Sequence, residues 1–137
     1  MPRVFNSDAE QCLRSILTAQ GFSLSPTRMH GQTGVDVLAT RGEDRYHIEV
    51  IGYKGSGSTR AKDFYESFFR VISRIKDGAI HCVIAMPKQA EVGLPARARQ
   101  YGIAWERIGD AFPELEIWLI DTAGESYQRS SWNKWIL

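Results

Sequence analysis

Two carboxylates lie within segments that are otherwise apolar and that alternate as β-strands do. Asp36 belongs to residues 35–40 (VDVLAT), and Glu49 belongs to residues 45–51 (RYHIEVI), which follow a tight turn. If the turn is centred between positions 42 and 43, opposed residues have numbers that sum to 85. On one face this register opposes only apolar residues, in the pairs Val35–Val50, Val37–Ile48 and Ala39–Tyr46. On the other face it sets Asp36 opposite Glu49.

The opposed carboxylates require a compensating charge. Directly opposed residues have Cβ atoms about 5 Å apart, and like charges at that spacing are destabilising. An arginine or lysine supplies the charge in an ordinary structural ion pair. A divalent cation also supplies it, since Mg²⁺ is commonly held by one or two carboxylates together with water and substrate phosphates. The pattern by itself leaves both interpretations open.

The carboxylate pair, with the order of the elements around it, resembles the PD-(D/E)XK nuclease superfamily, which includes restriction endonucleases and Holliday-junction resolvases. Residues 34–36 (GVD) correspond to the "PD" element, and residues 47–51 (HIEVI) correspond to the "(D/E)XK" element. Glu10 resembles an additional acidic residue that some members carry on the first helix, and the resemblance spans residues 8–86. It implies a restriction endonuclease-like three-layer α/β/α sandwich with a central mixed sheet. It also implies that Asp36 and Glu49 hold Mg²⁺ (or Mn²⁺) for the hydrolysis of phosphodiester bonds in DNA.

The chain departs from the family pattern at one position that matters for catalysis. Ile51 stands where the family has a lysine that assists the attacking water and stabilises the charged transition state. Lys54 is the first candidate to replace it, if the chain bulges or leaves the sheet at Gly52, and Lys62 is the second. His47 is two residues before Glu49 on the same strand face and is expected to line the site. The alternative is a catalytically inactive DNA-binding or assembly module that retains the nuclease fold.

Basic residues follow the second strand of the hairpin. A glycine-rich loop (GYKGSGST) leads into a helix, where backbone N–H groups favour an anion, although it lacks the Walker A spacing. Lys54, Arg60 and Lys62 are therefore candidate DNA contacts, and residues 54–76 hold six basic against two acidic residues. His30, in the loop before Asp36, is placed to approach a substrate. An unrelated domain that binds a small phosphorylated ligand at the glycine-rich loop is a third interpretation.

The remaining elements are those that must position this site. Hydrophobic periodicity predicts helices at residues 8–20 and 59–76, a short helix from Pro95 to Tyr101, and a helical turn with Trp105 and Ile108. Ser7 and Glu10 have the spacing of a capping box for the first helix. Strands are expected at residues 22–24, 79–86 and 115–121, and the tail is expected to pack back through its tryptophans.

Composition limits the class of protein. The chain has 137 residues, a formal net charge of +1, 43% hydrophobic residues and 24% charged residues, which predicts one globular domain over residues 1–137. Its two cysteines form no CxxC pair, so reduced thiols and a cytoplasmic location are expected. No apolar run reaches the length of a bilayer span, and no membrane partner is expected. Many proteins of the resembling family dimerise, and an edge strand or the tryptophan-rich tail could supply a homodimer interface.

Overall fold

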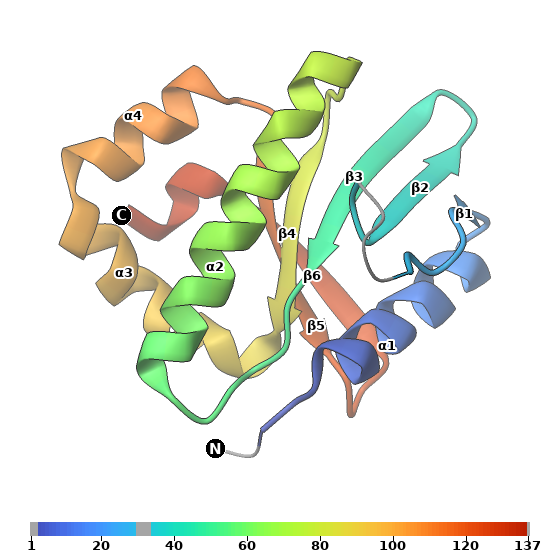
Figure 1. Cartoon of the computed structure of the whole chain (residues 1–137), viewed down its shortest axis with the longest axis horizontal. Helices are drawn as coiled ribbons and strands as arrows, with labels where there is room; N and C mark the ends of the chain where they lie inside the picture. Colours follow the sequence, from blue (N-terminus) through green and yellow to red (C-terminus); the bar gives the residue numbers. More distant parts are fainter. Residues whose placement is uncertain (1–2, 30–33, 137) are drawn as a thin grey trace.

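The computed structural model describes residues 3–29 and 34–136 of the chain. Figure 1 shows the arrangement of its helices and strands. The α-helices are α1 (Asn6–Ala19), α2 (Gly57–Ile72), α3 (Leu94–Tyr101) and α4 (Ile103–Ala111). The strands are β1 (Ser23–Leu24), β2 (Val37–Arg41), β3 (Asp44–Val50), β4 (Cys82–Pro87), β5 (Leu115–Asp121) and β6 (Ser126–Ser131). Short 3₁₀ segments follow α2, β4 and β6, at Ser73–Asp77, Lys88–Gly93 and Trp132–Ile136.

The six strands form one mixed sheet in the order β1-β2-β3-β4-β5-β6. The central strands β3, β4 and β5 are parallel, while β2 and β6 run antiparallel to their neighbours. Parallel neighbours require a crossover, which α2 provides between β3 and β4, and α3 with α4 between β4 and β5. The chain is therefore an α/β protein with a mixed sheet.

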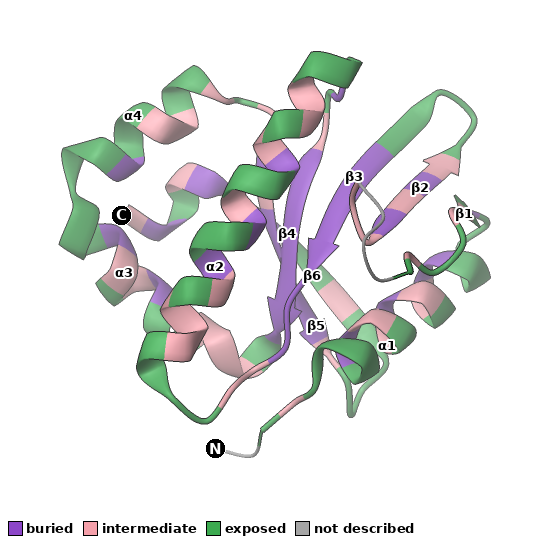
Figure 2. Ribbon diagram, in the orientation of Figure 1, coloured by how far each residue is buried: buried purple, intermediate pink, exposed green. Residues whose placement is uncertain are grey.

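Helices cover both faces of this sheet. On one face α1 buries Ala9, Leu13 and Leu17 against a core cluster that includes Ile48 and Trp118. On the other face α2, α3, α4 and the C-terminal 3₁₀ segment pack on a second cluster, and Figure 2 shows the central strands buried between the layers. Alternation along each strand separates the clusters, since Ile84 and Ile117 belong to the second one.

The predicted register of the hairpin is confirmed. Val37 pairs with Ile48, Leu38 with His47 and Ala39 with Tyr46, so opposed numbers sum to 85 as expected. Regular pairing ends at Val37, and Asp36 lies just before β2 rather than on the ladder. Asp36 nevertheless lies beside the end of β3, where its Oδ2 accepts a hydrogen bond of 2.9 Å from the Val50 N–H.

At the ends of the chain, one sequence expectation is wrong and one strand was not predicted. The first helix begins at Asn6 with Phe5 as its N-cap and no side-chain cap, so Ser7 and Glu10 form no capping box. Residues 126–131 form the edge strand β6, which its mostly exposed polar sequence (SYQRSS) did not indicate. The expectation that the tail packs back is confirmed, because Trp132 and Trp135 are buried. These tryptophans belong to the core of the chain itself and do not supply an exposed dimer interface.

The packing of the tail rests on a reciprocal pair of tryptophans. The indole N–H of Trp105 donates to the carbonyl of Trp132 at 3.0 Å, and the Trp132 indole returns a bond of 2.9 Å to the carbonyl of Trp105. Their rings stack with centroids 3.9 Å apart. In the described part of the chain, no helix is long and apolar enough to cross a bilayer.

Candidate functional site

The candidate site lies on the sheet face that α2 covers. Tyr46, Ile48 and Val50 belong to the cluster under α1, so alternation directs Glu49 and its neighbours His47 and Ile51 to the α2 side. Glu49 is 1% exposed and pairs laterally with Ile84 of the apolar core. A carboxyl group in such surroundings is costly to ionise.

Asp36 and Glu49 interact directly. A side-chain hydrogen bond joins them, and together with burial and the charge of Asp36 it raises the pKa of Glu49 to about 8, burial being the largest cause. The charges of Arg28 and Arg70 act in the opposite direction on this pKa. With its pKa raised to about 8, the Glu49 carboxyl favours the protonated form at neutral pH.

A cation also relieves the charge of this pair. Arg28 Nη2 donates to Asp36 Oδ1 at 3.0 Å, and both side chains are largely buried. An arginine is one of the compensating charges considered from the sequence for the two carboxylates, and Arg28 forms such an ion pair with Asp36. Glu49 has no ion pair among residues 3–29 and 34–136, and its buried Oε1 has no hydrogen-bond partner there.

The pair also fits a divalent cation. Mg²⁺ prefers oxygen ligands and retains several waters, so two carboxylates with one unsatisfied buried oxygen suit it. In the described ranges, no group of three or more His, Cys, Asp or Glu side chains gathers to hold a metal, at this pair or elsewhere. Asp36 and Glu49 are the two residues that would hold an ion, with water and phosphate completing its ligands.

The chain leaves the sheet immediately after Glu49 and Val50. Gly52 donates its N–H to Asn6 Oδ1 at 2.7 Å, and Tyr53 forms an isolated antiparallel bridge with Val4. The N-terminal segment approaches so closely that a Cβ on Gly52 would collide with the carbonyl oxygen of Val4 and lie 2.8 Å from the Asn6 nitrogen. The chain therefore leaves the sheet at Gly52, as the prediction from the sequence required if Lys54 is to point to the same side of the sheet as Glu49.

Lys54 forms an ion pair with α2. Its Nζ lies 3.0 Å from Asp63 Oδ2, and the two side chains are 28% and 17% exposed. Asp63 stands on the same side of α2 as Ser67 and Arg70, because spacings of four and seven residues return to one helix face. Of these, Ser67 is buried against the sheet and Arg70 acts on the Glu49 pKa. Lys54 is thus held on the helix stripe that also carries Ser67 and Arg70.

Ile51 is a core residue. It is 8% exposed and packs with Phe64 and Met86 beneath α2. The position of the family's lysine is therefore occupied by part of the hydrophobic core.

The remaining residues predicted for the site differ in their surroundings. His47 is buried, and burial, followed by the charges of Arg45 and Arg74, lowers its pKa. Lys62 is exposed and lies 3.8 Å from Glu66, which is a solvated helix pair. His30 is outside the described residues.

Glu10 contacts the site through an intermediary. Its Oε2 accepts from Arg14 Nε at 2.8 Å, and Arg14 Nη2 donates to the carbonyl oxygen of Asp36 at 2.8 Å. A third bond from Arg14 reaches the carbonyl of Ser25. Glu10 therefore orients an arginine that fixes the backbone at Asp36, rather than adding a third carboxylate to the pair.

Sequence reasoning missed Arg28 and Asp63. Both are joined to site residues only by tertiary contact, at separations of 8 and 9 positions that no periodicity links. The one available signal for Asp63 was its spacing of four and seven residues from Ser67 and Arg70 on an amphipathic helix.

Comparison of the chain with known protein families, with curated proteins and with solved structures finds no match.

Proposed function

We propose that the chain is a metal-dependent DNA endonuclease with a restriction endonuclease-like fold. The proposal rests chiefly on one observation: Asp36 lies beside the end of β3 near the buried Glu49, whose Oε1 has no hydrogen-bond partner among the described residues. The element order also supports it. A helix, a hairpin carrying the carboxylates, a second helix and a buried parallel strand follow one another as in the resembling superfamily. Both cysteines are unpaired, and we propose the cytoplasm as the compartment.

The residues divide the chemistry of hydrolysis among them. Water adds to the phosphorus while the bond to one ester oxygen breaks, so the products are a phosphomonoester and a hydroxyl group that gains a proton. Asp36 and Glu49 would hold Mg²⁺ or Mn²⁺, which lowers the pKa of bound water and neutralises phosphate charge. Lys54 presents a cation to the negative charge that develops on the phosphate oxygens. Asp63 limits the positions that this ammonium group can take.

The second candidate function is an inactive DNA-binding or assembly module with the same fold. The observation that favours it is the burial of Ile51 in the core, with Lys54 already neutralised by Asp63. In such a module Arg28 would satisfy Asp36 permanently, and no metal would be required. Binding of DNA without cleavage is its distinguishing property.

The deciding experiment measures cleavage of plasmid and branched DNA with Mg²⁺ or Mn²⁺. Wild type is compared with Glu49→Gln, whose amide cannot ionise to bind a metal, and with Glu43→Gln in the exposed hairpin turn as a matched control. We expect wild type and the control to cut and Glu49→Gln to lose at least about 100-fold in rate. Cleavage that survives Glu49→Gln would refute the assigned site, and retardation of DNA without any cleavage would establish the binding module.

The same assay identifies the lysine. Lys54→Met is expected to abolish cleavage while Lys62→Met leaves the rate within about twofold, because Lys62 is exposed and directed to solvent. The reverse result would transfer the role to Lys62.

A further inference from the structure

A cavity lies at the carboxyl ends of β3 and β4, beyond the end of the strand that carries Glu49. Its volume is about 300 Å³, and its inner wall is formed by the buried side chains of Ile51, Phe64, Met86 and Leu94. Ile51 is the next residue after Glu49 on the same strand face, about 7 Å along the strand. Open α/β sheets commonly bind ligands beyond the carboxyl ends of their parallel strands. The size is at the lower end of the range of ligand clefts.

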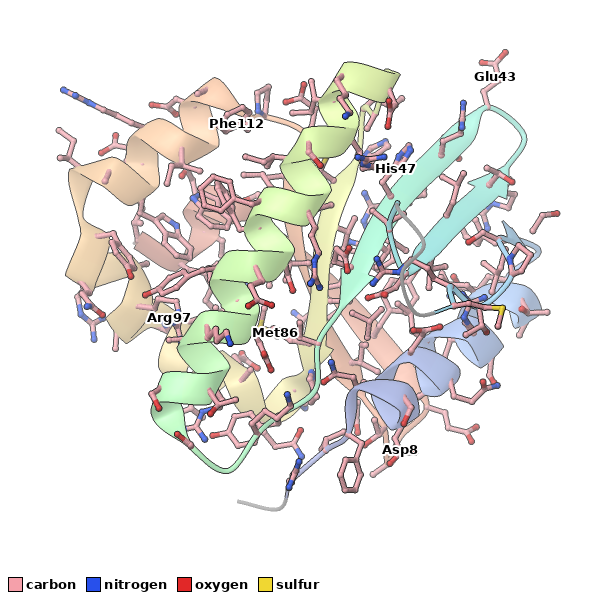
Figure 3. The ribbon with its side chains drawn as sticks, in the orientation of Figure 1. Asp8, Glu43, His47, Met86, Arg97 and Phe112 are labelled. Carbon is pink, nitrogen blue, oxygen red and sulfur yellow. The ribbon has the colours of Figure 1, made fainter. Side chains whose placement is uncertain are left out.

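Two arginines lie at the mouth of this cavity. Arg60 comes from the first turn of α2 and Arg97 from α3, which extends it toward α2 in Figure 3. Each guanidinium stacks on an aromatic ring, Arg60 at 4.6 Å from the Tyr53 centroid and Arg97 at 5.1 Å from that of Phe64. Stacking fixes the plane of a guanidinium while its N–H edge remains able to donate.

These arginines differ from the other basic groups near the site. Lys54, Arg28 and Arg14 are each paired with a carboxylate. Over the described ranges, neither Arg60 nor Arg97 has an acidic partner, and Arg60 donates only to the carbonyl of Lys54 at 2.6 Å. The cavity therefore carries two uncompensated positive charges over an apolar interior, which is complementary to an anion with an apolar, planar body.

Two other hollows of the described chain do not share this character. The one between α1 and the β5–β6 turn is lined by Asp8 and Glu125, which repel phosphate. The one between α2 and α4 is lined by aromatic and aliphatic side chains without a charged group.

We propose that this cavity binds one unstacked nucleotide of a DNA strand, with its base inside the apolar interior and a flanking phosphate at Arg60 and Arg97. The inference rests on the proposed function, since it names the class of DNA that the nuclease takes. Removing a base from a duplex stack costs a few kcal/mol, and the cost is smallest where the base is already unpaired. The preferred substrates are consequently single-stranded, branched or frayed DNA rather than continuous duplex.

Binding to labelled single-stranded oligonucleotides in EDTA tests the cavity without cleavage. Arg97→Gln should weaken binding about tenfold and reduce the slope of log K against log salt by about 0.7, the value for one phosphate contact on a single strand. Arg99→Gln, an exposed change on the same helix, should alter neither quantity. Equal behaviour of the two variants would overturn the assignment of the arginines.

The base is tested by comparing that strand with an abasic strand of equal length. Wild type should prefer the base-bearing strand about tenfold, and Val92→Trp, at the exposed rim, should lose this preference. Ile103→Trp, exposed and away from the cavity, should keep it, and melting temperatures establish that each variant is folded. An equal affinity of wild type for both strands, or for inorganic phosphate and a deoxynucleoside monophosphate, would overturn the base assignment.

The two proposals fail separately. If wild type cuts DNA through Glu49 but the cavity variants bind as wild type does, the cavity inference alone is wrong. If binding depends on Arg97 and Val92 while no DNA is cut, the cavity inference holds and the nuclease activity is wrong.

Discussion

The buried Glu49 should make the stability of the metal-free protein depend on pH. Its pKa is raised from its ordinary value of 4.5 to about 8, so the folded chain retains a proton that the unfolded chain releases between these values. The stabilisation is full below pH 4.5 and is lost as the pH rises through 8. Integrating the linkage for one such group gives a loss of about 3.5 kcal/mol between pH 5 and pH 8. That is a large part of the stability of a small domain.

Urea unfolding in EDTA at pH 5 to 9 measures this loss. Glu49→Gln mimics the protonated side chain, so its free energy of unfolding should lack this pH-dependent contribution. Relative to wild type, the stability of the variant should therefore rise by about 3.5 kcal/mol between pH 5 and pH 8. Glu43→Gln, in the exposed turn, controls for removal of a carboxylate. Parallel curves for wild type and Glu49→Gln would refute the argument that burial and Asp36 hold a proton on Glu49.

The same measurement at pH 8 with Mg²⁺ tests the metal interpretation. An ion that binds the pair should stabilise wild type by about 2.7 kcal/mol at 100 times its dissociation constant, and should not stabilise Glu49→Gln. No stabilisation of wild type would leave the proton and Arg28 as the only compensation.

Further substitutions test the supports of the site and of the fold. Gly52→Ala should destabilise the chain by about 1–3 kcal/mol in urea unfolding, since its Cβ has no space, and an unchanged midpoint would contradict the close approach. Asp63→Asn should lower the cleavage rate about 10–100-fold with DNA affinity nearly unchanged, because Lys54 loses its anchor; equal loss of both would indicate a structural effect. Trp132→Phe should cost about 1–3 kcal/mol by leaving the buried carbonyl of Trp105 without its donor, and a smaller effect would mean that water replaces the indole.

The sequence predicts correctly those elements whose hydrophobic pattern matches the way they are buried or paired in the folded chain. The hairpin register follows from apolar pairs that a shift of one residue would expose, and residues 37–41 pair as expected. The bounds of β5 coincide with its apolar run LEIWLID, and Pro95 stands in the first turn of α3.

Strand β6 and the start of α1 were not predicted, because their hydrophobic or capping patterns do not match the structure. Strand β6 buries only Ser130, so its alternation carries no hydrophobic signal. Its one local signal is the turn before it, where Asp121 Oδ1 accepts bonds from the N–H groups of Ala123 and Gly124. The capping box failed because Ser7 and Glu10 lie inside the helix, where Glu10 instead pairs with Arg14.

Under the proposed function, the absence of a lysine at position 51 has a physical explanation in the position of α2. A side chain at position 51 shares the face of Glu49, and that face is covered there by Phe64, so a lysine would be buried in an apolar cluster. Lys54 avoids this cost because the chain has left the sheet at Gly52 and because Asp63 supplies a partner on the helix. Ile51 and Phe64 also line the apolar cavity at this end of the sheet. Under the proposed function, Lys54 would therefore supply the cation that position 51 lacks, and the cavity would accommodate a base beside the phosphate.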